Sequence, residues 1–142
     1  MHISTKCSIA VHCLVFICDY GQTTRVTSGL LALSTGVNPV VIRNIVSALR
    51  KEGILSVKPG TGGTTVCCPL REITLYRIYE AVEPDFLDKL FGIHTAPFPF
   101  CLVGQNIHRV LDIPYGKVRE DLKKSLQGIT LEEMVQNFHN LT

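Results

Sequence analysis

The sequence predicts a mainly α-helical protein with one small β-hairpin, and three observations support this fold class. Apolar residues recur at helical spacing through most of the 142 residues. A glycine-rich turn at residues 58–63 separates two short alternating segments, directly after a capped helix. A long amphipathic pattern fills residues 107–126. We therefore expect a winged helix-turn-helix domain in residues 1–70, followed in residues 71–142 by a helical linker, an aromatic loop and a long dimerisation helix.

The charge of the chain is unevenly distributed. Its net charge is only +2 at pH 7, and 46% of its residues are hydrophobic, as in a globular domain. Residues 1–70 hold six Lys or Arg against two acidic residues, whereas residues 71–142 hold eight against ten. The basic half contains the capped helix and the hairpin, which is the distribution that a nucleic-acid-binding module requires.

The first helix is predicted at residues 3–19 and ends near Gly21. Its apolar positions recur at helical spacing: Ile3, Cys7, Ala10, Leu14 and Ile17. Cys7 and Cys18 lie on nearly the same face, and we interpret them as core packing, because the alternative, a metal or thiol sensor, lacks zinc-type ligand spacing. The chain has six cysteines but shows no secretory signal, since Lys6 interrupts its first apolar stretch. We expect a reduced, cytoplasmic protein.

A second, short helix is predicted next, which completes a helix-turn-helix. Ser28 is expected to cap it, because a hydroxyl accepts from the free backbone N–H groups of the first turn. Leu30, Leu31 and Leu33 are expected to point inward, and Gly36 to end the helix.

The third helix is predicted to begin at Asn38, because Asn caps free backbone donors and Pro39 suits the first turn. Gly53 ends it. Its core stripe consists of Ile42, Ile45, Val46 and Leu49. Its opposite face carries side chains suited to base edges and phosphates, namely Val40, Arg43, Asn44, Ser47, Arg50 and Lys51. Any solvated helix also presents a polar face, so the segment that follows decides between the two interpretations.

That segment is predicted to be a β-hairpin, with Ile54–Val57 and Thr64–Cys68 as its strands. Glycines in the loop at 58–63 allow its backbone to approach a phosphate or a minor groove closely. A nucleotide-binding loop is rejected, because no Lys-Ser/Thr pair follows and no helix opens from it. Cys67 and Cys68 would project to opposite faces of the second strand, so we interpret them as structural.

The C-terminal half is predicted to contain three helices and one irregular segment. The first helix covers Arg71–Glu83 and stops at Pro84; its apolar positions are Ile73, Tyr76, Tyr79 and Val82. A long helix follows, with Pro114 kinking or splitting it and with an apolar stripe at Ile107, Val110, Leu111, Val118, Leu122 and Leu126. Little of one chain remains to cover this stripe, so we infer a dimer. Gly128 ends the helix, and a capping box of Thr130 and Glu133 opens the last helix at residues 131–139.

The segment Phe86–Cys101 is aromatic and irregular. It is expected to pack against a partner subunit or, alternatively, to line an effector pocket. The candidate pocket residues are Phe86, His94, Phe98, Phe100 and Cys101.

These motifs resemble the Rrf family of bacterial winged-helix transcriptional regulators, which includes IscR, NsrR, CymR and YwnA-like proteins. The resemblance covers most of the chain and rests on the order and spacing of four parts: Leu49-Arg50-Lys51-Glu52-Gly53, Ser56-Val57-Lys58-Pro59-Gly60-Thr61-Gly62-Gly63, the segment from Glu72-Ile73-Thr74-Leu75 through Ala81-Val82-Glu83, and Ile129-Thr130-Leu131. It implies a homodimer that binds a palindromic operator on double-stranded DNA, with the third helix in the major groove and the wing at the flanking backbone or minor groove. We expect a repressor.

The resemblance also implies the residues that meet DNA. On the third helix these are Asn38, Val40, Val41, Arg43 and Asn44, and in the wing Lys58, Gly60, Gly62 and Gly63. With the neighbouring polar residues, the full predicted DNA-binding set is Asn38, Val40, Val41, Arg43, Asn44, Ser47, Arg50, Lys51, Lys58, Gly60, Thr61, Gly62 and Gly63. Some family members carry an acidic reader where this chain has Arg43, so we expect a preference for guanine there.

No cofactor, metal site or catalytic residue is predicted. Cluster-binding family members have three closely spaced cysteines before the long helix, whereas this chain has only Cys101 there, which argues against an iron–sulfur cluster. A cysteine enzyme built on Cys101 with His94 or His108 has the residue types but no motif. A further alternative is an effector- or partner-sensing protein that uses residues 86–101, with DNA binding secondary.

Overall fold

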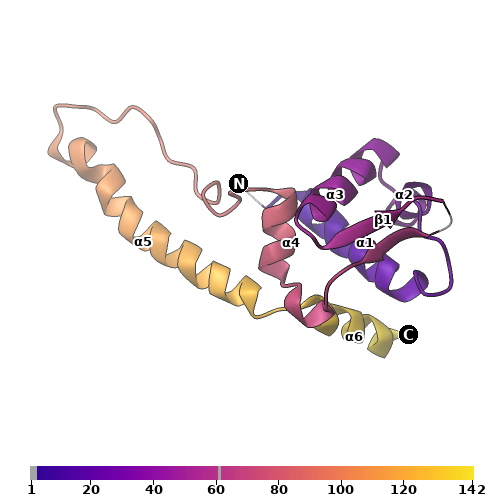
Figure 1. The fold of residues 1–142 in the computed structure, drawn as a ribbon. Helices are drawn as coiled ribbons and strands as arrows, with labels where there is room; N and C mark the ends of the chain where they lie inside the picture. Colours follow the sequence, from indigo (N-terminus) through magenta and orange to yellow (C-terminus); the bar gives the residue numbers. More distant parts are fainter. Residues whose placement is uncertain (1–2, 61) are drawn as a thin grey trace.

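The computed structural model describes residues 3–60 and 62–142 and contains six α-helices and a two-stranded antiparallel sheet (Figure 1). In chain order the elements are α1 (Thr5–Tyr20), α2 (Ser28–Thr35), α3 (Pro39–Lys51), β1 (Leu55–Lys58), β2 (Gly63–Val66), the 3-10 turn η1 (Leu70–Glu72), α4 (Leu75–Val82), α5 (Leu102–Gln127) and α6 (Leu131–Leu141). The mainly α fold with a small wing is therefore confirmed.

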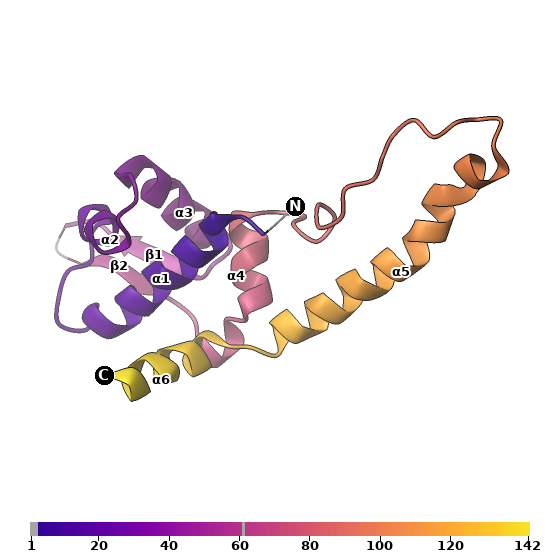
Figure 2. The ribbon, with the colours of Figure 1, turned by 180° about the vertical axis from the view of Figure 1, so that it is seen from behind.

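A compact body contains all of these elements except most of α5 (Figures 1 and 2). Its core is assembled around α1, which contacts α2, α3, α4, α6 and β2. The apolar stripes predicted for the first and third helices are buried, apart from the half-buried Ile3. The fully buried residues include Leu14 on α1 and Leu49 on α3. Helix α3 is thus held by one face, which leaves the other face exposed.

Two expectations for α2 are wrong. Thr27, not Ser28, is its N-cap, because the Thr27 side chain accepts a hydrogen bond from the Leu30 amide at 3.2 Å. Leu31 is buried, whereas Leu33 is 80% exposed. Two residues that lie two positions apart on a helix differ by about 200° in direction, so Leu31 and Leu33 cannot share a face. Gly36 ends the helix as expected, in the left-handed conformation with φ of 69°.

The wing is docked on the loop between α1 and α2. Its strands pair from Leu55 opposite Val66 to Lys58 opposite Gly63, and the Thr64 amide donates to the Val26 carbonyl at 3.0 Å. The second strand ends at Val66, so placing Cys67 and Cys68 within it is wrong. The Cys67 amide still donates to the Ile54 carbonyl at 3.1 Å, after which the chain leaves the sheet.

The predicted helix at Arg71–Glu83 is also wrong in its first turn. Ile73 is extended and buried, and α4 begins only after Thr74, whose side chain caps it. The segment that precedes α6 holds Ile73 in this conformation: the Leu131 amide donates to the Ile73 carbonyl at 2.7 Å, and the Leu75 amide donates to the Ile129 carbonyl at 2.8 Å. A pairing between distant segments therefore overrides the local helical pattern.

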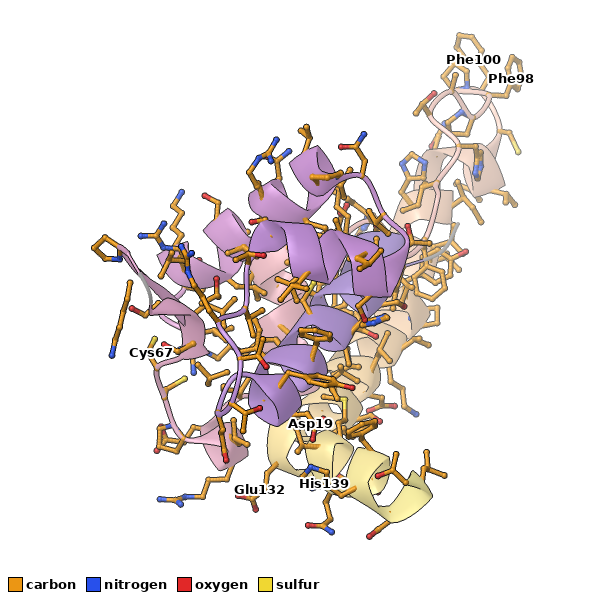
Figure 3. The ribbon with its side chains drawn as sticks, turned by 90° about the vertical axis from the view of Figure 1, so that its right-hand side faces the viewer. Asp19, Cys67, Phe98, Phe100, Glu132 and His139 are labelled. Carbon is orange, nitrogen blue, oxygen red and sulfur yellow. The ribbon has the colours of Figure 1, made fainter. Side chains whose placement is uncertain are left out.

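Helix α5 projects from the body as a long arm, and the chain returns at α6 (Figures 1 and 2). Pro114 lies inside α5 without splitting it, and Leu126 is its buried residue. Thr130 caps α6 by accepting from the Glu133 amide at 3.2 Å, and α6 packs against α1 and η1. Figure 3 shows Asp19 of α1 facing His139 of α6, with 3.3 Å between the Asp19 Oδ1 and His139 Nε2 atoms.

Within the described residues, no single helix has the length and apolarity to cross a membrane. The bent pair of α2 and α3, with 115° between the two helices, passes that test only when the two are taken together.

Candidate nucleic-acid interface

The start of helix α3 is fixed by a strong cap. The Asn38 Oδ1 atom accepts a hydrogen bond from the Val40 amide at 2.8 Å, and Pro39 occupies the first turn. The Asn38 carboxamide therefore uses its oxygen for the cap and keeps its NH2 group as a donor for another acceptor. Gly53, with φ of 74°, follows the C-cap residue Glu52 in the left-handed conformation expected of a helix end.

The structure gathers the predicted α3 residues on the outward face of this helix. Arg43, Asn44, Ser47, Arg50 and Lys51 are all exposed, as is Val40 at 53%. Neither ion pair found among the described residues involves the three cationic side chains of this set. Their charges therefore remain available for another partner.

Val41 differs from the rest of the predicted set because it is half-buried against the core. With Asn44, Ala48 and Lys6 it borders a small groove of about 120 Å³ between α1, α3 and α4. Val41 therefore helps to position α3 more than it extends the outward face.

Lys58 is exposed at the end of β1, and Gly60 is exposed in the turn that follows. A Cβ atom on Gly62 would lie 2.5 Å from the Lys58 Cβ atom. The Lys58 side chain therefore occupies space that any side chain at residue 62 would need. Gly63 is buried, has φ of 66°, and would place a Cβ atom 2.9 Å from the Val26 carbonyl oxygen. Gly63 therefore docks the wing on the body. Thr61 lies outside the described residues.

Sequence reasoning missed two cationic residues beside this surface. The position of a Cβ atom on Gly63 is 2.9 Å from the Arg25 Cγ atom, which puts the exposed Arg25 at the base of the wing. Lys6, also exposed, borders the groove next to Asn44. Neither residue stands near the third helix or the hairpin in the sequence, so no local pattern brings them to this surface.

The cysteines fall into two groups. Burial raises the pKa of the Cys7, Cys13 and Cys18 thiols to about 11, aided at Cys7 by the nearby Glu83 carboxylate. These three thiols therefore stay protonated at neutral pH, which agrees with the core-packing interpretation of Cys7 and Cys18. Cys67 and Cys101 are exposed, and Cys68 is half-buried.

The structure does not bring together the five residues of the predicted effector pocket. Phe86 is buried in the body against Tyr76 and Tyr79. Phe98 and Phe100 are 64% and 84% exposed at the far end of the arm, where Figure 3 labels them.

His94 and Cys101 of the same set are exposed as well. The His94 carbonyl oxygen lies 2.7 Å from the Nε2 atom of His108, which ties the irregular segment to α5.

The comparisons with known proteins agree on one family. The profile of a family described as Rrf2, iron-dependent transcriptional regulator, matches residues 3–137. YwnA of Bacillus subtilis (strain 168), described as a candidate HTH-type transcriptional regulator, is 29% identical over 135 residues, which cover 95% of this chain and 98% of YwnA.

Solved structures share the fold over nearly the whole length. A candidate DNA-binding protein is 27% identical with a TM-score of 0.71, over 91% of this chain and 97% of its own. CymR, the global cysteine regulator of B. subtilis, is 17% identical with a TM-score of 0.71, over 96% of this chain and 98% of the CymR chain. At that identity, the likeness to CymR shows the fold alone.

The description of the family names iron, but the residues that the structure describes bring together no set of side chains suited to an iron centre. A cluster needs several thiolates close together. The part of the chain that the structure describes holds no group of three or more His, Cys, Asp and Glu side chains able to bind a metal ion. The predicted absence of a cofactor stays a prediction.

Proposed function

Because the chain belongs to the Rrf2 family of transcriptional regulators, we propose that it binds a palindromic operator as a homodimer and acts as a repressor in the cytoplasm. The resemblance seen in the sequence is confirmed, and the relatives are described as regulators rather than enzymes. The observation that carries the proposal is the outward face of α3, which presents beside the wing cations that form no ion pair with the residues described in the structure.

The proposed surface divides into two parts. Arg43 and Asn44, on the exposed face of α3, have the donors and acceptors that read base edges in a major groove. Lys58 on the wing and Arg25 at its base offer cations to the phosphate backbone, with Gly60 and Gly62 allowing close approach. The proposed helix surface is completed by Asn38, Val40, Ser47, Arg50 and Lys51. Val41 helps to position the helix, and Gly63 docks the wing on the body. Thr61 belongs to the proposed DNA-binding loop of the wing.

The dimer is proposed from the arm. Five apolar side chains of α5 are between 46% and 79% exposed: Leu102, Val103, Val110, Ile113 and Val118. A helix of 26 residues is about 39 Å long, and little of its apolar side is covered within one chain. A second copy of α5 would bury this side, and would place two α3 helices on one DNA duplex. The proposed boundary between the DNA-binding part and the pairing part is residue 70.

The segment 86–101 is proposed to contact a partner subunit, rather than to enclose an effector. It is held in place on α5: the Gln105 Nε2 atom donates to the Pro99 carbonyl at 2.8 Å, and Phe91 stacks on Tyr115 with ring centroids 4.0 Å apart. Ordered backbone with exposed Phe98 and Phe100 suits a contact surface.

The full-length protein, incubated with a pool of random duplex DNA, tests this proposal. Repeated selection is expected to enrich sites with two-fold symmetry, whose half-sites lie about one helical turn, or a multiple of it, apart. Enrichment of single half-sites would contradict the dimer, and a pool that stays random would contradict sequence-specific binding.

A further inference from the structure

Two adjacent cysteines and one arginine form a cluster at the C-terminal end of α3, which we name the Cys67–Cys68–Arg77 cluster. The Cys67 Sγ atom lies 3.2 Å from the Gly53 carbonyl oxygen. The Arg77 guanidinium of α4 donates through Nη1 to the Cys68 Sγ atom at 3.6 Å and through Nη2 to the Glu52 carbonyl oxygen at 3.0 Å. Both sulfur atoms are thus connected, directly or through Arg77, to the carbonyl groups that follow the end of α3. Figure 3 labels Cys67 at the wing, far from Phe98 and Phe100.

The two sulfur atoms have different chemical surroundings. A carbonyl oxygen can only accept, so the Cys67 thiol is the donor in its hydrogen bond to Gly53. Cys68 instead accepts from a guanidinium, and such a bond is strongest when the sulfur is a thiolate. Because the thiolate is the nucleophile, this difference distinguishes Cys68 from its neighbour.

Cys68 is also within reach of a small molecule. It lines an open cleft of about 360 Å³ between the end of α1, the second strand of the wing and the segment after it; Ile17, Gly21 and Val66 line the same cleft. Cys18 is the other cysteine in the lining, but burial raises its pKa to about 11 and keeps it a thiol. The cleft therefore presents one sulfur with a cationic neighbour.

We propose that Cys68 is a modification site that exchanges with low-molecular-weight disulfides entering this cleft. The Cys68 sulfur attacks one sulfur of the disulfide R–S–S–R, a Cys68–S–S–R bond forms, and the original S–S bond breaks. The second R–S group leaves as a thiolate and takes up the proton that Cys68 has lost. Cys68 is oxidised to the mixed disulfide. One half of the small disulfide is released as the thiol R–SH, and the other half stays bound to Cys68.

Modification changes the support of α3. The R–S group is attached to the Cys68 sulfur and occupies the cleft beside the wing, so the hydrogen bond from Arg77 to that sulfur is expected to weaken. Arg77 is the side chain that holds the Glu52 carbonyl at the C-cap of α3, so the last turn of α3 and the start of the wing are expected to loosen. Only the effect on DNA binding rests on the proposed function.

Exposure of the full-length reduced protein to bis(2-hydroxyethyl) disulfide, followed by mass mapping of its cysteine peptides over time, tests the site. Cys68 is expected to be modified first. Arg77→Met is expected to slow the Cys68 reaction at least about fivefold, Arg77→Lys to slow it less, and Cys101, at the other end of the molecule, to react at an unchanged rate in both. Earlier modification of Cys67 or Cys101, or an unchanged Cys68 rate in Arg77→Met, would overturn the proposal.

Hydrogen exchange measures the consequence without DNA. The Gly53 and Ile54 amides, which donate to the Arg50 and Leu49 carbonyls, are expected to exchange faster after modification in the wild type and to stay unchanged in treated Cys68→Ser. Unchanged exchange in modified wild type would overturn the loosening of α3. Operator affinity, measured next, should fall on treatment of the wild type and not of Cys68→Ser. Protein that binds no operator even when reduced would refute the proposed function and leave the Cys68 assignment, which is measured without DNA, intact.

Discussion

The body and the arm of this molecule differ in how far they bury their apolar residues. In the body, α1 alone buries Cys7, Ala10, Cys13, Leu14 and Ile17 against the surrounding helices and the wing. In the arm, the 26 residues of α5 bury Leu126 only, at the end next to the body. The body is thus complete within one chain, whereas the arm presents apolar surface that one chain leaves uncovered.

This difference separates two kinds of residue that look alike in the sequence. Leu14 and Val110 both belong to predicted apolar helical stripes, but Leu14 is 0% and Val110 is 60% exposed. Burial of the first stabilises the monomer, and burial of the second requires a second molecule. Substitutions in the two regions should therefore alter different measurable quantities.

The largest effect is expected from truncation of the body core. Leu14→Ala removes a fully buried side chain at the centre of the α1 contacts and should lower the free energy of unfolding by about 2–5 kcal/mol. Urea denaturation followed by circular dichroism measures it. Leu33→Ala, at an exposed position of α2, is the matched control and should change stability little. Equal losses in the two variants would contradict the assignment of the core.

The arm should respond in self-association instead. Ile113→Glu puts a charge on the exposed apolar side of α5 and is expected to raise the dimer dissociation constant roughly 10- to 100-fold. Sedimentation equilibrium over a range of protein concentrations measures the change. Asp112→Asn, one residue earlier and also exposed, should leave the constant nearly unchanged. A dimer that tolerates Ile113→Glu would place the pairing surface elsewhere.

Two glycines of the wing provide a smaller, paired test within the body. Gly63→Ala would bring a Cβ atom against the Val26 backbone at a φ of 66°, and is expected to cost on the order of 1–3 kcal/mol of stability. Gly60→Ala has a φ of 80° but no atom within 4 Å, so a cost of about 1 kcal/mol is expected from the backbone alone. Thermal or urea unfolding compares them, and a larger loss at Gly60 would contradict docking of the wing through Gly63.

The smallest effect concerns pH. Burial raises the pKa of Cys7 and Cys13 from 9.0 to about 11, and folding therefore disfavours their ionisation. This contribution to stability is fully present below pH 9 and is lost as the pH rises through 11. Stability measured between about pH 7 and pH 10.5 should fall less steeply in Cys13→Ala than in the wild type, and Leu33→Ala, which removes no titratable group, should match the wild-type slope. Parallel slopes in all three proteins would contradict the effect.

Sequence patterns predicted the elements of the body well where neighbouring residues in the chain determine the conformation. The start of α3 is set by Asn38 and Pro39, and its end is set by Gly53. In each case the residue acts on backbone groups of the helix itself. The N-cap of α2 was misplaced by one residue because Thr27 and Ser28 both carry a hydroxyl. The side chain that reaches the Leu30 amide depends on where the preceding loop enters the helix.

Features set by contacts between distant segments were not predictable from the sequence. The extended conformation of Ile73 depends on hydrogen bonds with the segment before α6, and the position of Arg25 beside Gly63 depends on docking of the wing. The Cys67–Cys68–Arg77 cluster joins the wing to α4 in the same way. The exposed polar side of α3, by contrast, follows from helical periodicity alone.

The central claim is that α3 contacts the base edges of DNA while the wing contacts the DNA phosphate backbone. The salt dependence of DNA binding tests this claim most directly. Affinities of the wild type, Arg43→Ala and Lys58→Ala would be measured for the selected operator and for unrelated DNA at several salt concentrations. Arg43→Ala should lose about 1–3 kcal/mol on the operator and little on unrelated DNA, while Lys58→Ala should weaken both equally and lower the salt slope by about 1. Wild-type affinity and salt slope in both variants would contradict the claim.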